Sequence, residues 1–455
     1  MIRRIGAILS AVSLVLAMSV APVAAADAPA DAQVQTLYAG KTTAVGTVTV
    51  WNDETTLYVK YETTGGWLLT ETHVHVDTAF GQLPQNKQKN PEPGHFRDGA
   101  FYEPPVAEDT FQFALAQFDA SQLYIAAHAV VVGPDCDNGP YYASQVTEYI
   151  EGANANKNDP TQALGAPDSS GPPDWTGHVN LGFEGSLTVA FDALVFNGDG
   201  SQDISIHEVS PAGSALETAD VYVLADGIEY FAGTVTNSGI IDPDWVKVDW
   251  VAIPDDLTWV EAVKLVDRSS AGYNGFDVDA VDAPCLLSRT ESAWADGDRF
   301  TPRGNWATYF TYDVKSWRLV ETVSVPSNAS AGASSSNALE AGKDYRLVAT
   351  GTWHDSSTAN HHIDAEYCTF DNWATHIDGT ISWGPNQKDL QVDGIFVDWG
   401  AFNTEHEYTL LVPGTGAVLA FRIFDGKANA TPPAIESTWY GDNVGNLTVT
   451  IYCWS

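Results

Sequence analysis

Three oxygen-bearing side chains lie near one another in the last part of the chain. Asp425 ends the apolar segment 421–425, and Asp442 and Asn443 precede a second, β-branched segment, 444–451. A hairpin made from these segments brings the three residues to the same end. Ca²⁺ binds carboxylate, amide and backbone carbonyl oxygens at about 2.3–2.6 Å in flexible loops. The sequence therefore predicts a calcium site at the mouth of this hairpin.

The surrounding sequence, about residues 318–453, resembles the calcium-dependent galactophilic lectins of the bacterial PA-I type. The segments that carry the resemblance are 345–355, 421–425 and 439–451. The resemblance implies that the ion binds two vicinal hydroxyls of a sugar, because Ca²⁺ exchanges water for hydroxyl oxygens at high coordination number. The calcium ligands that it implies are the side chains of Asp425, Asp442 and Asn443, the carbonyl of Trp439, and Asp355 near the second carbonyl position.

Two departures from that family affect the ligand rather than the ion. The segment 426–437 is longer than the family's short turn, and 371–383 has no counterpart of its sugar-contacting His/Gln pair. Nearby residues that we expect to contact a ligand are Trp353, Asp364 and Trp373, with Trp439 as a further ring that could stack on a pyranose. Three alternatives stay open: calcium binds the sugar, calcium only fastens the hairpin, or the hairpin holds no metal.

Other groups of polar side chains allow further ion sites. His73 and His75 share one face of a predicted strand, and with His128 they could bind zinc or copper, although such histidines are more often ordinary surface or core residues. Asp277 and Asp279 also share a strand face and could hold a cation with Asp159; the alternative is a solvated face. A cluster in the last domain is read as loop chemistry or ligand contacts: His354, His361 and His362 with Asp364 and Glu366.

The chain lacks the sequence motifs of common hydrolases and nucleotide-binding enzymes. It has no Gly-x-Ser-x-Gly, no His-Glu-x-x-His and no phosphate-binding loop, and nothing isolates a pair of carboxylates for glycoside hydrolysis. We therefore expect a protein that is not an enzyme.

Almost every segment has the pattern of a β-strand. Alternating or β-branched runs occur at 45–50, 56–61, 72–76, 110–115 and 123–132, and turn-forming residues separate them. The sequence thus predicts an all-β protein of two or three antiparallel, jelly-roll-like β-sandwich domains. The middle part also resembles galactose-binding-like and discoidin-type modules of secreted surface proteins, through the segments 159–168, 181–189 and 275–281.

The cysteines and one aromatic segment organise the domains. Residues 290–312 form too little structure to bury themselves, so we expect 286–317 to complete a sandwich with 33–133. Residues 134–285 are then an inserted domain, and 318–455 form the lectin-like domain. The alternative is a linear string of domains with 286–317 as a linker.

Two disulfides are the default for four cysteines in an oxidising compartment. The ends of an insertion lie close together, so we expect Cys136 to pair with Cys285. Cys368 then pairs with Cys453.

The N-terminal segment 1–26 has the organisation of a signal peptide. Arg3 and Arg4 precede the apolar stretch 5–20, and small residues end at Ala26. A membrane anchor is the alternative, but the stretch is short for a stable span. We expect a secreted or cell-surface protein with no membrane insertion after cleavage.

Charge narrows the class of partner. With 21 basic and 59 acidic residues and a net charge of −38, the chain lacks the basic surface that nucleic acid needs. Anionic membranes are also disfavoured. We expect a non-catalytic, calcium-dependent protein that binds an extracellular glycan; the alternative is a structural or adhesion spacer of the cell surface or extracellular matrix.

Overall fold

The computed structural model describes residues 27–171, 173–198, 200–211, 214–238, 245–270, 274–303, 305–355, 361–369, 373, 388–427, 434–435 and 437–455, so the predicted signal segment 1–26 lies outside the described residues. The described chain consists of antiparallel strands with only short 3-10 turns, and the predicted all-β class is confirmed. It forms two compact units, which divide between Tyr312 and Asp313.

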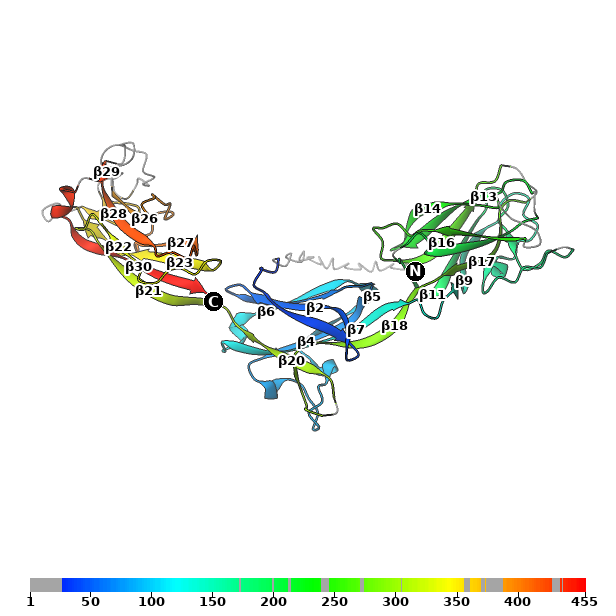
Figure 1. Ribbon diagram of the computed structural model, residues 1–455, viewed down its shortest axis with the longest axis horizontal. Coiled ribbons are helices and arrows are strands. Elements are labelled where there is room, and N and C mark those ends of the chain that lie inside the picture. The colour runs from blue at the N-terminus through cyan, green and yellow to red at the C-terminus, as the bar shows by residue number, and fades with distance from the viewer. Residues whose placement is uncertain are drawn as a thin grey trace, which may run out of the picture. The chain divides into compact units, whose positions relative to one another are not determined.

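The N-terminal lobe of the first unit has two layers of strands (Figure 1). One layer contains, in spatial order, β1 (Gln33–Ala39), β2 (Thr43–Asn52), β3 (Thr56–Thr63) and β6 (Glu108–Ala114). The other contains β5 (Asp98–Val106), β4 (Leu68–Asp77), β7 (Gln122–Asp135) and β20 (Thr308–Asp313), and β20 also pairs with the short β19 (Asp298–Arg299).

The period of two in the sequence explains these strands. In β2 the side chains of Val48 and Val50 are buried, whereas Thr47 and Thr49, which alternate with them, are partly exposed. Branched apolar side chains thus fill one face and polar ones reach the other. Tyr61 of β3 is fully buried and joins the layers by donating from its hydroxyl to the backbone carbonyl of His73 in β4, at 2.9 Å.

Strand β18 (Leu286–Ala295) returns the chain to this lobe after the middle segment. It pairs with β7 over Thr290–Val132 to Trp294–His128, and with β1 at Leu37–Ala295. Residues 286–295 therefore complete the N-terminal sheet, while the following unit begins at Asp313 rather than at 318.

The middle lobe is a second pair of layers. The first contains, in spatial order, β14 (Ile228–Thr236), β13 (Thr218–Ala225), β16 (Trp259–Asp267), β11 (Ser186–Phe196) and β9 (Gln145–Ile150), and β11 also meets β18. The second contains β10 (Val179–Asn180), β17 (Asp277–Ala283), β12 (Ile204–Val209) and β15 (Val246–Val251), with β8 (Tyr141–Tyr142) beside β17. Alternating apolar residues of both layers form one core, as Val221 and Val223 of β13 and Ile204 and Ile206 of β12 show.

The C-terminal unit is a separate sandwich. Its larger sheet has the order β25 (His362–Ile363), β24 (Trp353–His354), β30 (Val444–Trp454), β23 (Asp344–Thr350) and β27 (Glu407–Pro413), and β21 (Trp317–Pro326) pairs with β30. The smaller sheet contains β22 (Ala333–Ser334), β28 (Ala420–Lys427) and β26 (Lys388–Val392), with β29 (Ala434–Ile435) beside β28. Apolar residues from both sheets, including Leu347, Ile423 and Ile451, form a single core.

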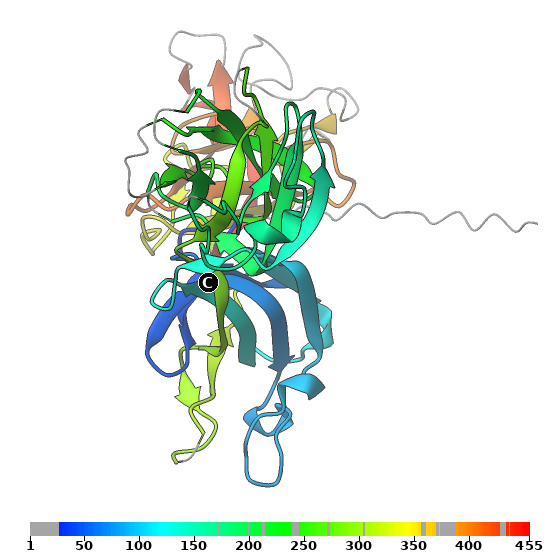
Figure 2. The same cartoon turned by 90° about the vertical axis from the view of Figure 1, so that its right-hand side faces the viewer.

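Short 3-10 turns connect the strands: η1 (Phe80–Gln82), η2 (Pro93–His95), η3 (Leu115–Gln117), η4 (Pro160–Ala163) and η7 (Trp439–Gly441). Two loops leave the N-terminal lobe on the same side in both views, one around residues 80–97 and one around 297–307 (Figures 1 and 2). Among the described residues, there is no helix with the length and apolarity that a membrane crossing requires.

Candidate functional site

Three of the predicted calcium ligands meet in the C-terminal unit. Asp425 lies in β28 and is 1% exposed, and Asn443, just before β30, is also buried. Asn443 Nδ2 donates to Asp425 Oδ2 at 3.0 Å and to the Ser327 carbonyl at 2.9 Å. Asp355, which follows β24, contacts the same Lys388 side chain as Asp425. We call Asp355, Asp425, Asn443 and Lys388 the acidic mouth.

The ammonium group of Lys388 lies between the two carboxylates of the acidic mouth. Lys388 begins β26 and stands opposite Asp425 in the strand register. Its Nζ is 3.1 Å from Asp425 Oδ1 and 3.2 Å from Asp355 Oδ2. The side chains of Lys388, Asp355 and Asp425 are only 16%, 15% and 2% exposed, so these charge-assisted hydrogen bonds are partly shielded from water. The arrangement binds a cation, and here that cation is a lysine ammonium.

One oxygen of the acidic mouth is left over. Asn443 Oδ1 is buried and has no hydrogen-bond partner within the described part of the chain, a state that costs about 1–3 kcal/mol. Two carboxylates and an amide oxygen are donors that Ca²⁺ prefers, so Asp355, Asp425 and Asn443 fit this ion when the Lys388 side chain turns away. Among the described residues, no three side chains of His, Cys, Asp or Glu converge closely enough to hold a metal ion. The acidic mouth differs from such a group because its third oxygen donor is the amide of Asn443.

The other two predicted ligands lie at the turn η7. Asp442 is exposed and Trp439 is half-buried. Tyr440 between them is buried, and its hydroxyl donates to the Ile423 carbonyl at 2.7 Å and accepts from the Asp425 amide at 3.0 Å. Burial raises the pKa of this hydroxyl above its usual value. The sequence analysis missed Tyr440, which fastens the turn to the strand that carries Asp425.

Two of the three residues expected to contact a sugar are buried. Trp353 is 0% exposed, so its ring is closed to a pyranose, and this expectation was wrong. Asp364 is likewise 0% exposed, and its carboxylate accepts from His406 Nδ1 at 2.9 Å and from the Tyr408 hydroxyl at 2.7 Å. It fastens loops to the core instead of facing a ligand. Trp373 is half-buried, and its contact with a sugar stays a prediction.

One loop histidine reaches the acidic mouth. His361 Nδ1 lies 3.2 Å from Asp355 Oδ1, on the carboxylate whose other oxygen faces Lys388. The rings of His354 and His362 pack against each other with centres 4.3 Å apart. The loop cluster therefore orients Asp355 through a single histidine.

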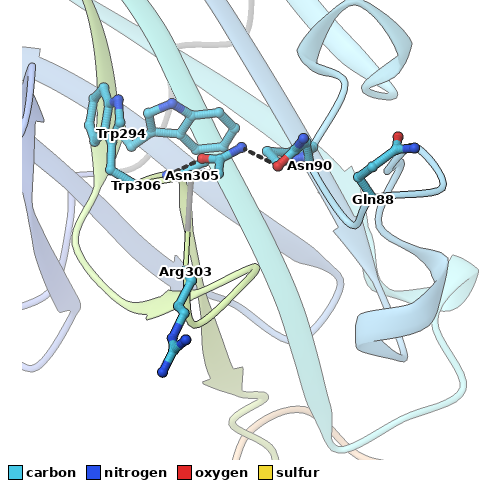
Figure 3. A pocket seen from close by; sticks show the side chains of 8 residues that line it. Gln88, Asn90, Trp294, Arg303, Asn305 and Trp306 are labelled. Atoms are coloured by element: carbon cyan, nitrogen blue, oxygen red, sulfur yellow. Dashed lines mark hydrogen bonds between the residues drawn. The ribbon is translucent and has the colours of Figure 1, made fainter.

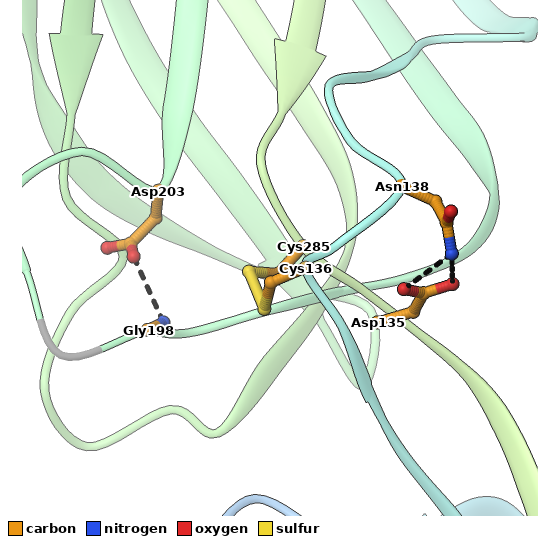
Figure 4. The surroundings of a disulfide bond; sticks show 6 residues. All are labelled: Asp135, Cys136, Asn138, Gly198, Asp203 and Cys285. Atoms are coloured by element: carbon orange, nitrogen blue, oxygen red, sulfur yellow. Dashed lines mark hydrogen bonds between the residues drawn. A yellow bond between two sulfur atoms is a disulfide. The ribbon is translucent and has the colours of Figure 1, made fainter.

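The structure contains the predicted disulfide between Cys136 and Cys285 (Figure 4). The two Cα atoms are 4.3 Å apart although 149 residues separate them in the sequence. The bond lies where β7 leaves the N-terminal lobe and β18 returns to it. Next to it Asn138 donates to both carboxylate oxygens of Asp135, at 3.1 and 3.0 Å.

The second predicted disulfide, Cys368–Cys453, was wrong, because both residues are buried thiols that are not bonded to each other. The backbone of Cys368 forms a β-bridge with Ile363. Ile363 is the strand partner of Trp353, which in turn pairs with Gly445 of β30. Cys453 lies eight residues farther along β30, roughly 26 Å at about 3.3 Å per residue. A disulfide needs Cα atoms within about 7 Å, so the strand register forbids this pair.

The strand histidines form a hydrogen-bonded chain rather than a converging trio. His73 Nδ1 lies 3.2 Å from His128 Nδ1, His73 Nε2 2.9 Å from Glu71, and His128 Nε2 2.9 Å from the Ser292 hydroxyl. His75, on the same face of β4, has a different partner: its Nδ1 accepts from the Arg97 amide at 3.0 Å. Burial, and secondarily the charge of His73, lowers the pKa of His128 to about 3. The His128 ring is therefore neutral at pH 7 and serves as a hydrogen-bonding group of the sheet.

The middle-lobe carboxylates are also held by hydrogen bonds. Asp277 and Asp279 are 8% and 1% exposed, so the alternative of a solvated strand face was wrong. Asp279 Oδ1 accepts from the Asp168 amide at 3.1 Å, and Asp277 accepts from the Asn180 amide group. Asp159 instead caps η4 through the Thr161 amide.

A cavity that the sequence analysis missed opens on the N-terminal lobe, with a volume of about 620 Å³ (Figure 3). It lies between the loops around 80–97 and 297–307. Its lining residues are Gln88, Asn90, Pro91, Trp294, Arg303, Asn305, Trp306 and Ala307. Asn90 and Asn305, which meet there, are 215 residues apart, so no local pattern in the sequence announces the cavity.

No family model matches the chain, and no curated protein matches it either.

Proposed function

We propose that this protein is exported and binds carbohydrate outside the cell without catalysing a reaction, and that its C-terminal sandwich does so through calcium. The observation that supports this proposal is the meeting of Asp355, Asp425 and Asn443, from three segments, around one cation position. Bringing these side chains together is energetically unfavourable unless a cation is bound, because buried carboxylates need a compensating charge.

Calcium would supply a centre that accepts two neighbouring hydroxyls of a sugar in place of water. The residues of the chain have simpler tasks. Asp425 and Asp355 provide negative charge, Asn443 provides an oxygen that has no partner within the described residues, and Tyr440 keeps the turn against β28. Lys388 competes with the ion for the carboxylates, so calcium binding depends on the concentration of the ion.

The test uses the mature full-length chain on a glycan array, once with millimolar calcium and once with EDTA. We expect calcium-dependent binding that Asp425→Asn abolishes and that the matched control Asp344→Asn, at an exposed carboxylate of the same unit, leaves intact. If neither EDTA nor Asp425→Asn changes the glycan binding, the proposed role of calcium is contradicted. No glycan binding under either condition contradicts the whole proposal and favours the spacer alternative.

A further inference from the structure

The loop-lined cavity of the N-terminal lobe has the composition of a sugar-binding cleft. We infer that it is a second, calcium-independent binding site for a neutral oligosaccharide, with Trp306 as the stacking surface and Asn90, Asn305 and Gln88 as hydrogen-bonding groups. The inference extends the carbohydrate binding proposed above to another lobe, but it does not use the acidic mouth.

Two indole side chains form the apolar part of the cavity (Figure 3). Trp294 is 5% exposed and is fixed by the rings of His128 at 4.8 Å and Phe300 at 6.1 Å, centre to centre. Trp306 is only partly buried against the same aromatic cluster. A rigid indole thus supports a more open one. The flat face of an indole packs against the C–H face of a pyranose, and its N–H remains available as a polar group.

Amide side chains form the polar part. Asn305 Nδ2 donates to Asn90 Oδ1 at 3.2 Å, and Asn305 Oδ1 accepts from the Ala307 amide at 2.6 Å. Asn90 is half-buried and the Gln88 side chain is exposed, and both line the cavity. An amide both donates and accepts, as sugar hydroxyls also do. The two kinds of group are therefore complementary.

The loop that carries these amides is already ordered. Asn86 Oδ1 accepts from the backbone amides of Gln88 at 2.9 Å and Asn90 at 3.1 Å, and the Asn86 amide donates to the Asn90 carbonyl at 2.9 Å. A preformed loop loses less conformational entropy when a ligand binds. This arrangement favours a recognition site over a loop that merely covers the core.

Charge and size narrow the ligand class. Not one of the residues that line the cavity is acidic, although the chain has 59 acidic residues and a net charge of −38. Arg303, the one charged side chain among the described residues of this lining, points away from the two indoles (Figure 3). A cavity of about 620 Å³ lies within the usual range of about 300–1,000 Å³ for small-molecule sites. An uncharged ligand of a few sugar rings fits these conditions.

The test titrates the full-length chain in EDTA with cellohexaose, laminarihexaose, xylohexaose and mannohexaose, by calorimetry and tryptophan fluorescence. We expect at least one of these probes to bind with a millimolar or lower dissociation constant. Trp306→Ala should weaken that binding at least tenfold, whereas Trp250→Ala, at a 41% exposed indole of the middle lobe, should not change it.

A second variant guards against a folding defect. Gln88→Ala changes an exposed side chain, so it should leave the melting temperature unchanged and still weaken binding severalfold. If none of the four probes binds in EDTA, or if Trp306→Ala and Gln88→Ala both bind as well as the unchanged chain, the inference is wrong. Binding that needs calcium and disappears in Asp425→Asn, but not in Trp306→Ala, overturns this second site while supporting the acidic mouth.

Discussion

Lys388 decides the present charge balance of the acidic mouth. Its ammonium lies 3.1 Å from the buried carboxylate of Asp425 and 3.2 Å from the half-buried carboxylate of Asp355. Removing one partner of a buried ion pair costs about 3–5 kcal/mol, because the remaining charge has no compensation. The lysine thus compensates the charge of both carboxylates.

The variant Lys388→Met keeps the length of the side chain and removes its charge. We expect the free energy of unfolding of the C-terminal unit to fall by about 3 kcal/mol in EDTA, and calcium to restore most of it. Denaturant unfolding with and without calcium measures both effects.

The matched control for this variant is Lys343→Met. Lys343 pairs with Glu340 at the surface, and exposed pairs contribute about 0–1 kcal/mol. An equal response of the two variants to calcium would contradict a shared site for lysine and ion.

At the scale of single elements, strand β17 carries buried aspartate side chains. Asp277 lies near His178, at 3.9 Å, and Asn274, at 3.3 Å, and it also faces Asn180, Lys157 and Glu217. Burial, and secondarily the charge of Glu217, raises the pKa of Asp277 to about 8. The strand therefore keeps a protonated carboxyl at neutral pH.

This pKa makes the first unit less stable as the pH rises. The folded chain holds the Asp277 proton up to about pH 8, whereas an unfolded aspartate loses it near pH 4. The stabilisation is complete below about pH 4 and is lost progressively up to pH 8. Since each pKa unit corresponds to about 1.4 kcal/mol, we expect a loss of a few kcal/mol between pH 5 and pH 9, which calorimetric melts of the full chain measure.

The variant Asp277→Asn should flatten this pH dependence, because asparagine does not titrate. The control Asp226→Asn changes an exposed residue with a positive φ of 52°, a conformation that asparagine tolerates. If the stability of Asp277→Asn still depends on pH as strongly as that of the unchanged chain, another group causes the dependence. Glu208, whose pKa is raised by burial to about 9, is then the next residue to replace.

At the scale of the whole molecule, the Cys136–Cys285 disulfide ties the two ends of the middle segment. It closes a loop of 149 residues, and the chain-entropy estimate for such a loop is roughly 5 kcal/mol. The double variant Cys136→Ser/Cys285→Ser should therefore lower the melting temperature of the first unit by about 10 °C.

Differential scanning calorimetry resolves this effect by unit. The transition of residues 313–455 should stay in place, because the bond lies entirely in the first unit. Reducing agent should lower the melting temperature of the first unit in the unchanged chain. It should leave the melting temperature of that unit unchanged in the double variant. Equal shifts of both transitions would contradict the assignment.

The fold class and one disulfide were predictable from the order of the residues alone. Alternation in segments such as 45–50 and 72–76 predicts strands because the period of two is a property of neighbouring residues. Asp425 and Asn443 do meet, but the predicted hairpin was wrong, because β28 and β30 lie in different sheets of the sandwich and the contact forms between them. The Cys136–Cys285 bond followed from the way in which a chain leaves a sheet and returns to it.

The contacts between distant segments depend on the packing of the folded layers. It placed Lys388 opposite Asp425, brought Asn90 to Asn305, and set Cys453 far along β30 from Cys368. Strand register and loop placement depend on how whole layers pack around a core. A one-residue change of register reverses every side chain, and no local pattern in one strand records the partner that fixes it.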